Sequence, residues 1–362
     1  MSAMTATLGS RNWTNSHAEQ TGRKALNRTS STTGLAQKGQ YRNVLVILTS
    51  IAPGLWKWYT WCTIEAAQPT SMTKPVTLLQ ERPAKGALTR TGGFLKGFSH
   101  TLQPYIGCRF GCSYCYVSQS NVHRFYNGGM EWGSYVYPRV GIAERLETEL
   151  AALHRRDALE RTAIFMSSST DPYQGADLTY RLTRQCLSVF QIYPPGLLVI
   201  QTRAPLAARD FDVMAALGKR CLLNLTIETD RDDVRRVLTP HCPSIQQRLE
   251  TARQARNHGI ATQLTVSPCL PFSGVEAFGQ LLLEAGDRVI VDSYVDGDGG
   301  GGKRTARTAI PGLYARSGWE DWRSHEAALS LYDWLSRRIG NSAAWSQEGF
   351  TRQARSITGN VC

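Results

Sequence analysis

From residue 100 onward, short apolar segments alternate with segments of helical periodicity, and this alternation constrains the fold more than any other feature. It is typical of repeated βα units, whose parallel sheet is buried between helices. The expected strands are residues 100–107, 162–168, 196–202, 221–228, 260–267 and 288–293. The expected helices are residues 142–155, 178–192, 206–217, 244–258, 275–285 and 327–339. We therefore expect an α/β fold, a partial (β/α)6 TIM-type barrel with parallel strands, whose chemistry gathers at the carboxyl ends of the strands.

The chain of 362 residues divides into four segments. Residues 1–71 are rich in Ser, Thr, Asn and Gly, and we expect them to form a disordered N-terminal extension. Because Met72 opens a segment that looks like a natural beginning, the alternative is that the start codon was wrongly chosen. Residues 72–99 are expected to form a lead-in segment, residues 100–295 the core barrel, and residues 296–362 a Gly-rich loop followed by a C-terminal helical segment.

The charge balance is basic, because 41 Lys and Arg residues exceed 29 Asp and Glu residues by 12. This excess favours a polyanionic partner such as nucleic acid, although a solvated basic surface explains it equally well. No segment is long and apolar enough to cross a bilayer comfortably. The nearest, residues 44–61, contains Pro53, Gly54 and Lys57. We therefore expect no membrane association. We also expect the protein to be a monomer.

Three of the nine cysteines, Cys108, Cys112 and Cys115, lie within eight residues in the spacing C-x3-C-x2-C. An odd number of cysteines, most of them scattered, is a poor disulfide framework for a chain of this length. We therefore expect a reducing, cytoplasmic compartment and metal chemistry at the clustered cysteines. The isolated cysteines in apolar segments are expected to be buried in the core: Cys186, Cys221 and Cys269.

Thiolates are the usual ligands of iron–sulfur clusters. A cubane has four irons, so three close sulfurs leave one iron with an open position, which marks a reactive site rather than a structural one. Three alternatives remain. The cysteines could bind zinc with a distant fourth ligand such as His123, form a redox-active thiol set, or hold a ferredoxin-like cluster with a remote fourth cysteine.

The C-x3-C-x2-C spacing, with the aromatic Tyr114 directly before the last cysteine, resembles the radical S-adenosylmethionine superfamily. Within it, the sequence is similar to the subgroup related to spore photoproduct lyase, often labelled DNA-repair-photolyase-like. The resemblance extends over roughly residues 95–295. The matching stretches are TLQPYIGCRFGCSYCYV at 101–117, SSSTDPYQ at 167–174, TR at 202–203, TIET at 226–229, LTPHCPSIQQRLETARQARNHGI at 238–260 and VSPCLP at 266–271.

This resemblance implies a [4Fe–4S] cluster, bound by the three cysteines, and S-adenosyl-L-methionine chelated to the fourth iron. In the family, an electron from the cluster cleaves the sulfonium, and the 5′-deoxyadenosyl radical abstracts a hydrogen atom from substrate. An electron donor such as flavodoxin or ferredoxin is implied. The substrate is unidentified: nucleic acid is one candidate, and a peptide or small metabolite is another. An iron–sulfur or zinc protein without radical catalysis is the non-enzymatic alternative.

The resemblance also implies S-adenosylmethionine contacts, but no catalytic residue. Tyr114 lies against the adenine, or is a packing aromatic. Arg203 faces the carboxylate, for which a guanidinium is a good bidentate partner, or is a surface arginine. The end of the second strand supplies the side chains for the methionine amino group, although Asp171 could instead cap a helix. These side chains are Ser168, Ser169, Thr170 and Asp171.

Asn224, Thr226 and Glu228 alternate along one strand and therefore share a face. A polar row inside a barrel needs partners, which are either ribose hydroxyls or one another. Thr226 and Glu228 are accordingly candidate cofactor contacts, and Ser267 is expected to flank the adenine. One departure matters: Ser168 stands where spore photoproduct lyases carry the cysteine that returns a hydrogen atom. Thymine-dimer repair by that route is therefore not implied.

Overall fold

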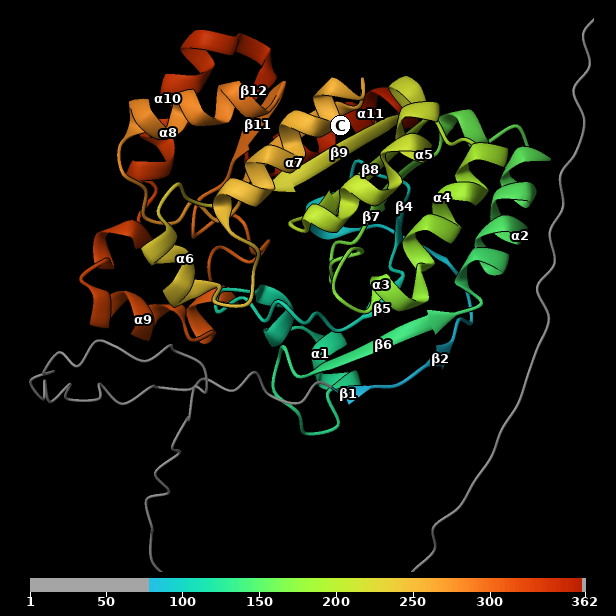
Figure 1. The fold of residues 1–362 in the computed structure, drawn as a ribbon, viewed down its shortest axis with the longest axis horizontal. Helices are drawn as coiled ribbons and strands as arrows, with labels where there is room; N and C mark the ends of the chain where they lie inside the picture. Colours follow the sequence, from blue (N-terminus) through green and yellow to red (C-terminus); the bar gives the residue numbers. More distant parts are fainter. Residues whose placement is uncertain (1–77, 360–362) are drawn as a thin grey trace, which may run out of the picture. The chain divides into compact units, whose positions relative to one another are not determined.

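The computed structural model describes residues 78–359, so the expected N-terminal extension, residues 1–71, lies outside the described residues (Figure 1). The strands are β1 (Leu78–Leu79), β2 (Arg82–Pro83), β3 (Leu88–Arg90), β4 (His100–Leu102), β5 (Tyr105–Ile106), β6 (Tyr135–Val140), β7 (Ala163–Met166), β8 (Leu197–Thr202), β9 (Cys221–Thr226), β10 (Ala261–Val266), β11 (Arg288–Val291) and β12 (Ala343–Trp345). The α-helices are α1 (Asn121–Tyr126), α2 (Ile142–His154), α3 (Asp177–Tyr180), α4 (Leu182–Ile192), α5 (Phe211–Ala216), α6 (Asp232–Leu238), α7 (Ile245–Asn257), α8 (Val275–Ala285), α9 (Ile310–Ser317), α10 (Glu326–Ile339) and α11 (Ser346–Thr358).

The main sheet has eight strands in the order β12-β11-β10-β9-β8-β7-β4-β3. Each neighbouring pair from β4 to β12 is parallel, and β3 pairs antiparallel with β4. Within residues 78–359, β3 and β12 are the two edges, so the sheet stays open rather than closing into a full barrel. The expected α/β fold with parallel strands is confirmed, and β12 adds a parallel strand that the sequence did not predict.

The first expected strand, residues 100–107, is divided in two. β4 belongs to the main sheet, whereas β5 pairs antiparallel with β6 in a separate small sheet. Pro104 lies at the break, where its missing N–H cannot contribute to a continuous ladder. The division redirects the chain toward the cysteine motif, which follows β5 directly.

Most helices begin and end close to the expected residues. α8 has the expected bounds, and α7 begins after Ser244, whose side chain accepts a hydrogen bond from Gln247 in a reciprocal capping box. The expected helix 178–192 instead begins at residue 182, because Arg181 has a left-handed φ of 51° and separates α3 from α4. In the described part of the chain, no helix has the length and apolar character of a membrane span.

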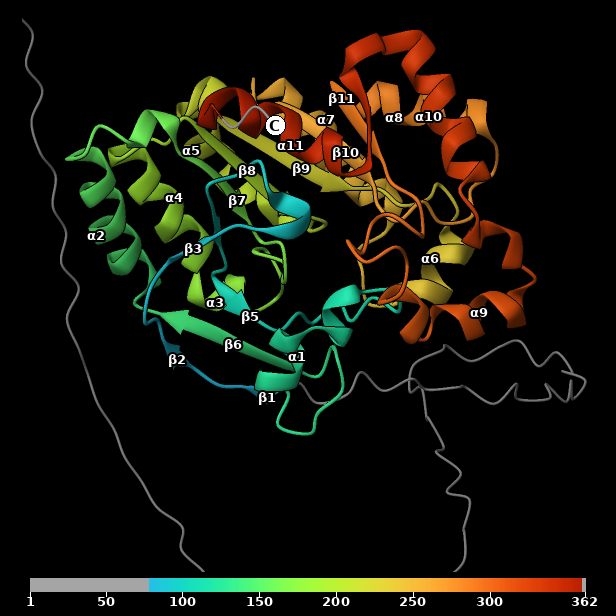
Figure 2. The same cartoon turned by 180° about the vertical axis from the view of Figure 1, so that it is seen from behind.

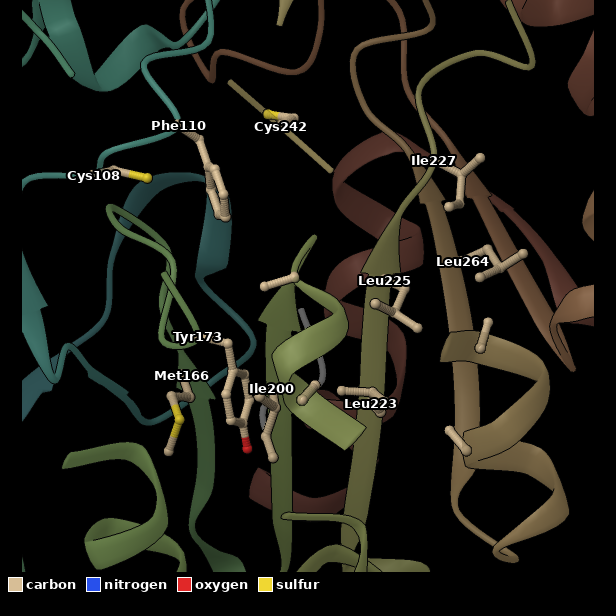
Figure 3. Close-up of a cluster of buried hydrophobic side chains, with 14 of the residues drawn as sticks. Cys108, Phe110, Met166, Tyr173, Ile200, Leu223, Leu225, Ile227, Cys242 and Leu264 are labelled. Atoms are coloured by element: carbon tan, nitrogen blue, oxygen red, sulfur yellow. The ribbon is translucent and has the colours of Figure 1, made fainter. Parts of the chain in front are cut away.

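The strands bury a core on each face, because successive side chains point in opposite directions. On β9, Leu223 and Leu225 belong to the large core beneath the outer helices (Figure 3), and each contributes on the order of 2 kcal/mol by its burial. Leu222 points the other way and joins a smaller core, which includes Ala354 and Phe350 of α11. α11 therefore covers the inner face of the sheet, as the view from behind shows (Figure 2).

The isolated cysteines confirm the expectation that they lie in the core. Cys186, Cys221 and Cys269 are each at most 2% exposed. None of the cysteines within residues 78–359 forms a disulfide.

Candidate functional site

A cavity of about 540 Å³ lies where the parallel strands end, which is the expected position for a site in this class of fold. This volume is within the range of small-molecule and cofactor sites. The inner face contributes Phe165 of β7 and Phe350 of α11, and the Gly-rich segment contributes Asp298 and Arg304. All the predicted metal and cofactor residues line this cavity except Glu228: Cys108, Cys112, Tyr114, Cys115, Ser168, Ser169, Thr170, Asp171, Arg203, Thr226 and Ser267.

The cysteine loop begins at Gly107, immediately after β5. Gly107 has a φ of 81°, and a Cβ at this position would overlap the carbonyl oxygen of Tyr135, so only glycine fits. Inside the loop, the N–H of Cys115 donates to the carbonyl of Cys112 at 3.0 Å. The N–H of Ser113 donates to the carbonyl of Leu238, also at 3.0 Å, and thereby ties the loop to the end of α6.

The segment after β7 supports the same loop from the opposite side. Gln174 accepts a hydrogen bond from the N–H of Arg109 at 2.9 Å, and the hydroxyl of Thr170 donates to the carbonyl of Gly107 at 2.5 Å. The hydroxyl of Tyr116 in turn donates to the carbonyl of Ser168 at 2.8 Å. The predicted polar residues after the second strand therefore hold the cysteine loop as well as line the cavity.

Asp171 links the ends of two neighbouring strands. Its carboxylate accepts hydrogen bonds from the hydroxyl of Thr202 at 2.8 Å, the N–H of Arg203 at 2.9 Å and the N–H of Tyr173 at 2.9 Å. Burial raises the pKa of Asp171, although these hydrogen bonds act in the opposite direction. The bond to Tyr173, two residues ahead, forms a local turn rather than the helix cap considered from the sequence.

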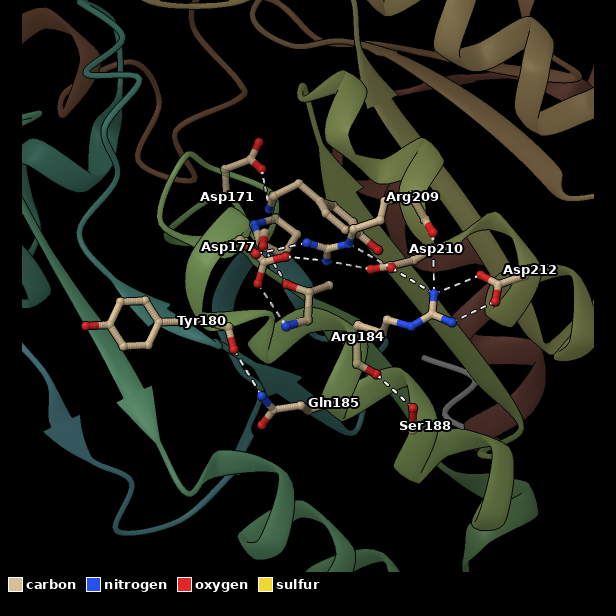
Figure 4. A network of polar contacts seen from close by, with 12 residues as sticks. Asp171, Asp177, Tyr180, Arg184, Gln185, Ser188, Arg209, Asp210 and Asp212 are labelled. Carbon is tan, nitrogen blue, oxygen red and sulfur yellow. Dashed lines mark hydrogen bonds and ion pairs between the residues drawn. The ribbon is translucent and has the colours of Figure 1, made fainter. Parts of the chain in front are cut away.

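A neighbouring ionic network fixes the segment that precedes the cysteine loop (Figure 4). Asp177 accepts a hydrogen bond from the hydroxyl of Tyr105 in β5 at 2.5 Å. Arg209 forms ion pairs with Asp177 at 2.6 Å and with Asp210 at 2.8 Å. Because both carboxylates are buried, the shared guanidinium offsets their cost of desolvation and joins β5 to the chain after β8.

Glu228 does not line the cavity and is 1% exposed. Its carboxylate accepts hydrogen bonds from Tyr114 and Arg203 on one oxygen and from Arg248 at 2.5 Å on the other. Burial opposes ionisation of this carboxyl, but Arg203 and Arg248, with the hydrogen bonds from Tyr114 and Arg248, hold the pKa of Glu228 down at about 2. Glu228 is thus positioned to orient Tyr114 and Arg203, both of which do line the cavity.

The polar row expected on β9 is present as a buried network. Asn224 donates to Gln201 at 2.5 Å, Gln201 donates to the hydroxyl of Thr226 at 2.6 Å, and Thr265 donates to Asn224. Thr226 also lines the cavity, so its side chain belongs both to the network and to the site.

Sequence reasoning missed two residues that contact this site. Cys242 lies within the matching stretch 238–260, but its position was not predicted; its Sγ is 3.7 Å from Cys112 Sγ and 3.8 Å from Arg203 Nη1. Arg248, on α7, was not among the predicted residues, and its side chain is fully buried against Glu228. In Figure 3, Cys108 and Cys242 lie at the end of the core toward which β8 and β9 point.

The lining suits a metal cluster together with a polar ligand. Burial raises the pKa of Cys108 and Cys115 and thus opposes formation of their thiolates. Arg203 lowers both pKa values, but by less than burial raises them. A cationic metal group would supply the positive charge that the buried thiolates need. Within residues 78–359, no three His, Cys, Asp or Glu side chains are arranged so that they could hold one metal ion. The thiolates of a cubane bind different irons and therefore lie farther apart than the ligands of one ion.

His123, the candidate fourth ligand of a zinc site, has its Nδ1 3.0 Å from the hydroxyl of Tyr135.

Three lining residues have a buried polar atom without a hydrogen-bond partner in the described part of the chain. They are the hydroxyl of Ser167, the indole N–H of Trp132 and the hydroxyl of Tyr294. Because buried polar atoms in folded proteins usually have partners, these three atoms leave hydrogen-bonding capacity unused in the residues around the cavity.

Asp292, just after β11, is expected to make stability depend on pH. It is fully buried and accepts a hydrogen bond from Ser267 at 3.0 Å. Burial raises its pKa from 3.8 to about 7. Between these values the folded protein binds a proton that the unfolded chain does not, so the free energy of unfolding rises as the pH falls from 7 toward 4. Three pKa units correspond to about 4 kcal/mol at most.

The variant Asp292→Asn should lack this contribution, because its amide does not titrate. We expect it to be more stable than the unsubstituted protein at pH 8 and to lose most of that advantage at pH 5. Urea unfolding of both proteins at the two pH values measures the difference. An equal difference at both values would contradict the assignment.

The sequence of this chain is similar to those of other proteins. The model of the Radical SAM superfamily matches residues 102–282. A protein of Methanocaldococcus jannaschii, described as uncharacterized, is 26% identical over 177 residues, covering 49% of this chain and 62% of that protein. A protein of Acidianus two-tailed virus, also described as uncharacterized, is 27% identical over 204 residues, covering 52% of this chain and 63% of that protein. The chain thus matches less than two thirds of the length of these two relatives.

A solved structure shares the fold. A mutant of spore photoproduct lyase with bound AdoMet and dinucleoside spore photoproduct matches with a TM-score of 0.53 and 15% identity. The match covers 75% of this chain and 82% of that protein.

Proposed function

This chain belongs to the radical S-adenosylmethionine superfamily, and we propose that it binds a [4Fe–4S] cluster through Cys108, Cys112 and Cys115 and cleaves S-adenosylmethionine reductively. One observation carries the proposal: the three cysteines and all the predicted S-adenosylmethionine contacts except Glu228 line a single cavity at the carboxyl ends of the strands. When bound, the reduced cluster supplies the electron that cleaves the sulfonium, which yields a 5′-deoxyadenosyl radical able to abstract a hydrogen atom from substrate.

The cavity residues bind and orient the cofactors. Arg203 contacts Tyr114, Glu228 and Cys242 through Nη1, which leaves its other nitrogens to meet the methionine carboxylate. Tyr114 is held by Glu228 and provides a fixed aromatic wall for the adenine. Thr226 and Ser267 serve the ribose and the adenine edge, and the side chains of Ser168 and Ser169 serve the methionine amino group.

Nucleic acid is the proposed substrate class. Arg90 and Arg304 line the cavity together with Phe94, Tyr116 and Trp132. Cationic side chains bind phosphates and aromatic rings stack on bases, so this lining suits a strand whose base enters the cavity. Ser168 accepts a hydrogen bond from Gln103 at 2.8 Å and has no thiol, so the proposal does not include hydrogen return from this position.

Anaerobic reconstitution tests the proposed function. We expect a brown protein with about four irons per chain, which releases 5′-deoxyadenosine and methionine when S-adenosylmethionine and dithionite, or a donor such as flavodoxin or ferredoxin, are added. A protein that binds zinc tightly and has no visible absorbance would contradict the proposal. Single-stranded oligonucleotides should raise 5′-deoxyadenosine formation above the uncoupled level. If instead peptides or small metabolites raise it, the substrate class is wrong but the cofactor chemistry stands.

A further inference from the structure

We propose that the thiol of Cys242 donates a hydrogen bond to the Cys112 thiolate and thereby raises the reduction potential of the cluster. The inference rests on the proposed function, because it needs a cluster on Cys112. The two sulfurs are 3.7 Å apart, and Cys242 is 5% exposed. Cys242 is not among the residues that line the cavity, so it acts on the cluster through Cys112 rather than on substrate.

The direction of the hydrogen bond follows from the chemistry of the pair. With both thiols free, either sulfur could donate. A cysteine that ligates iron is a thiolate, which has no proton and can only accept. The shared proton therefore belongs to Cys242, whose S–H is a weak donor.

Backbone and side-chain contacts hold Cys242 in this position. Its N–H donates to the carbonyl of Thr239 at 3.0 Å, and its carbonyl accepts from Arg235 Nη1 at 3.1 Å. The bond from Ser113 to Leu238 ties the same segment to the cysteine loop. Arg203 Nη1, 3.8 Å from the sulfur of Cys242, places a positive charge beside the pair. The position of the Cys242 sulfur is thus fixed before any cofactor binds.

The hydrogen bond should favour the reduced cluster. Reduction adds a negative charge to the cluster and its thiolates, and hydrogen bonds to the sulfurs stabilise that charge. Removing the donor should lower the ratio of reduced to oxidised cluster at a fixed potential by about tenfold. For a one-electron couple this is a shift of about 59 mV to more negative potential.

Potentiometric titration of the reconstituted full-length protein, followed by electron paramagnetic resonance of the reduced cluster, measures the effect. We expect Cys242→Ala to keep the iron and sulfide content of the unsubstituted protein and to have a more negative midpoint. Cys242→Ser should restore most of the shift, because a hydroxyl also donates. The matched control is Cys221→Ala, which also removes a buried thiol. Cys221 lies at the amino end of β9, about 16 Å along the strand from Thr226 at the cavity end.

Two results would overturn the inference. If Cys242→Ala holds its cluster at an unchanged midpoint, the hydrogen bond has no effect on the potential. If Cys242→Ala loses its iron while Cys221→Ala keeps it, Cys242 is a ligand rather than a donor. Absence of a cluster in the unsubstituted protein is a separate result, since it overturns the proposed function and this inference with it.

Discussion

Replacing Cys108 by alanine is expected to abolish both cluster binding and 5′-deoxyadenosine formation. Three thiolates hold the proposed cubane, and losing one leaves two of its irons without a protein ligand. Cys108 is a sharper test than Cys112, because the sulfur of Cys242 lies 3.7 Å from Cys112 and could replace it. Iron and sulfide analysis after anaerobic reconstitution, with chromatography of the nucleoside product, measures the two losses.

Cys221→Ala serves as the control, since Cys221 is buried at the amino end of β9 and has no part in the proposed site. It should keep its iron and release 5′-deoxyadenosine at a rate close to that of the unsubstituted protein. Full iron content in Cys108→Ala would show that the ligand assignment is wrong.

Replacing Arg248 by methionine is expected to cost about 3–5 kcal/mol of the free energy of unfolding. The guanidinium is fully buried and pairs with Glu228 at 2.5 Å, so its removal leaves a buried carboxylate only partly compensated. The same change should weaken S-adenosylmethionine binding, because Glu228 also positions Tyr114 and Arg203. Urea unfolding and equilibrium binding to the reconstituted protein measure the two effects.

Arg256 on the same helix provides a matched comparison. It pairs with Asp287 at 2.8 Å, but both side chains are well exposed, at 38% and 46%. Surface pairs contribute about 0–1 kcal/mol, so Arg256→Met should be nearly neutral. Equal losses in the two variants would mean that burial of the Arg248 pair has no special cost.

The sequence predicts the architecture where its signals are local. The helix at 244–258 has a capping signal at Ser244 and a glycine at 259, and α7 occupies almost the expected range. The cysteine loop and the strand-end residues lie in one cavity because the carboxyl ends of parallel strands meet at one edge of the sheet, a consequence of topology.

The missed features depend on partners far away in sequence. Arg248 lies on a helix rich in charge, where a single arginine gives no sign of burial; its environment is decided by Glu228, twenty residues earlier. β12 has three residues, too few for a strand pattern. α11 carries only a narrow apolar stripe of Phe350, Ala354 and Ile357, and its burial depends on the open face of the sheet.

The supports of the cysteine loop imply an order of maturation. Residues 108–115 are held by Thr170 and Gln174 on one side and by Leu238 on the other, so more than half of the polypeptide must emerge from the ribosome before the loop has its native shape. Iron and sulfide delivered to a shorter nascent chain would reach the three thiols before the contacts that hold their loop have formed. Assembly of the proposed cluster is therefore expected to follow synthesis of the segment through α6 rather than accompany it.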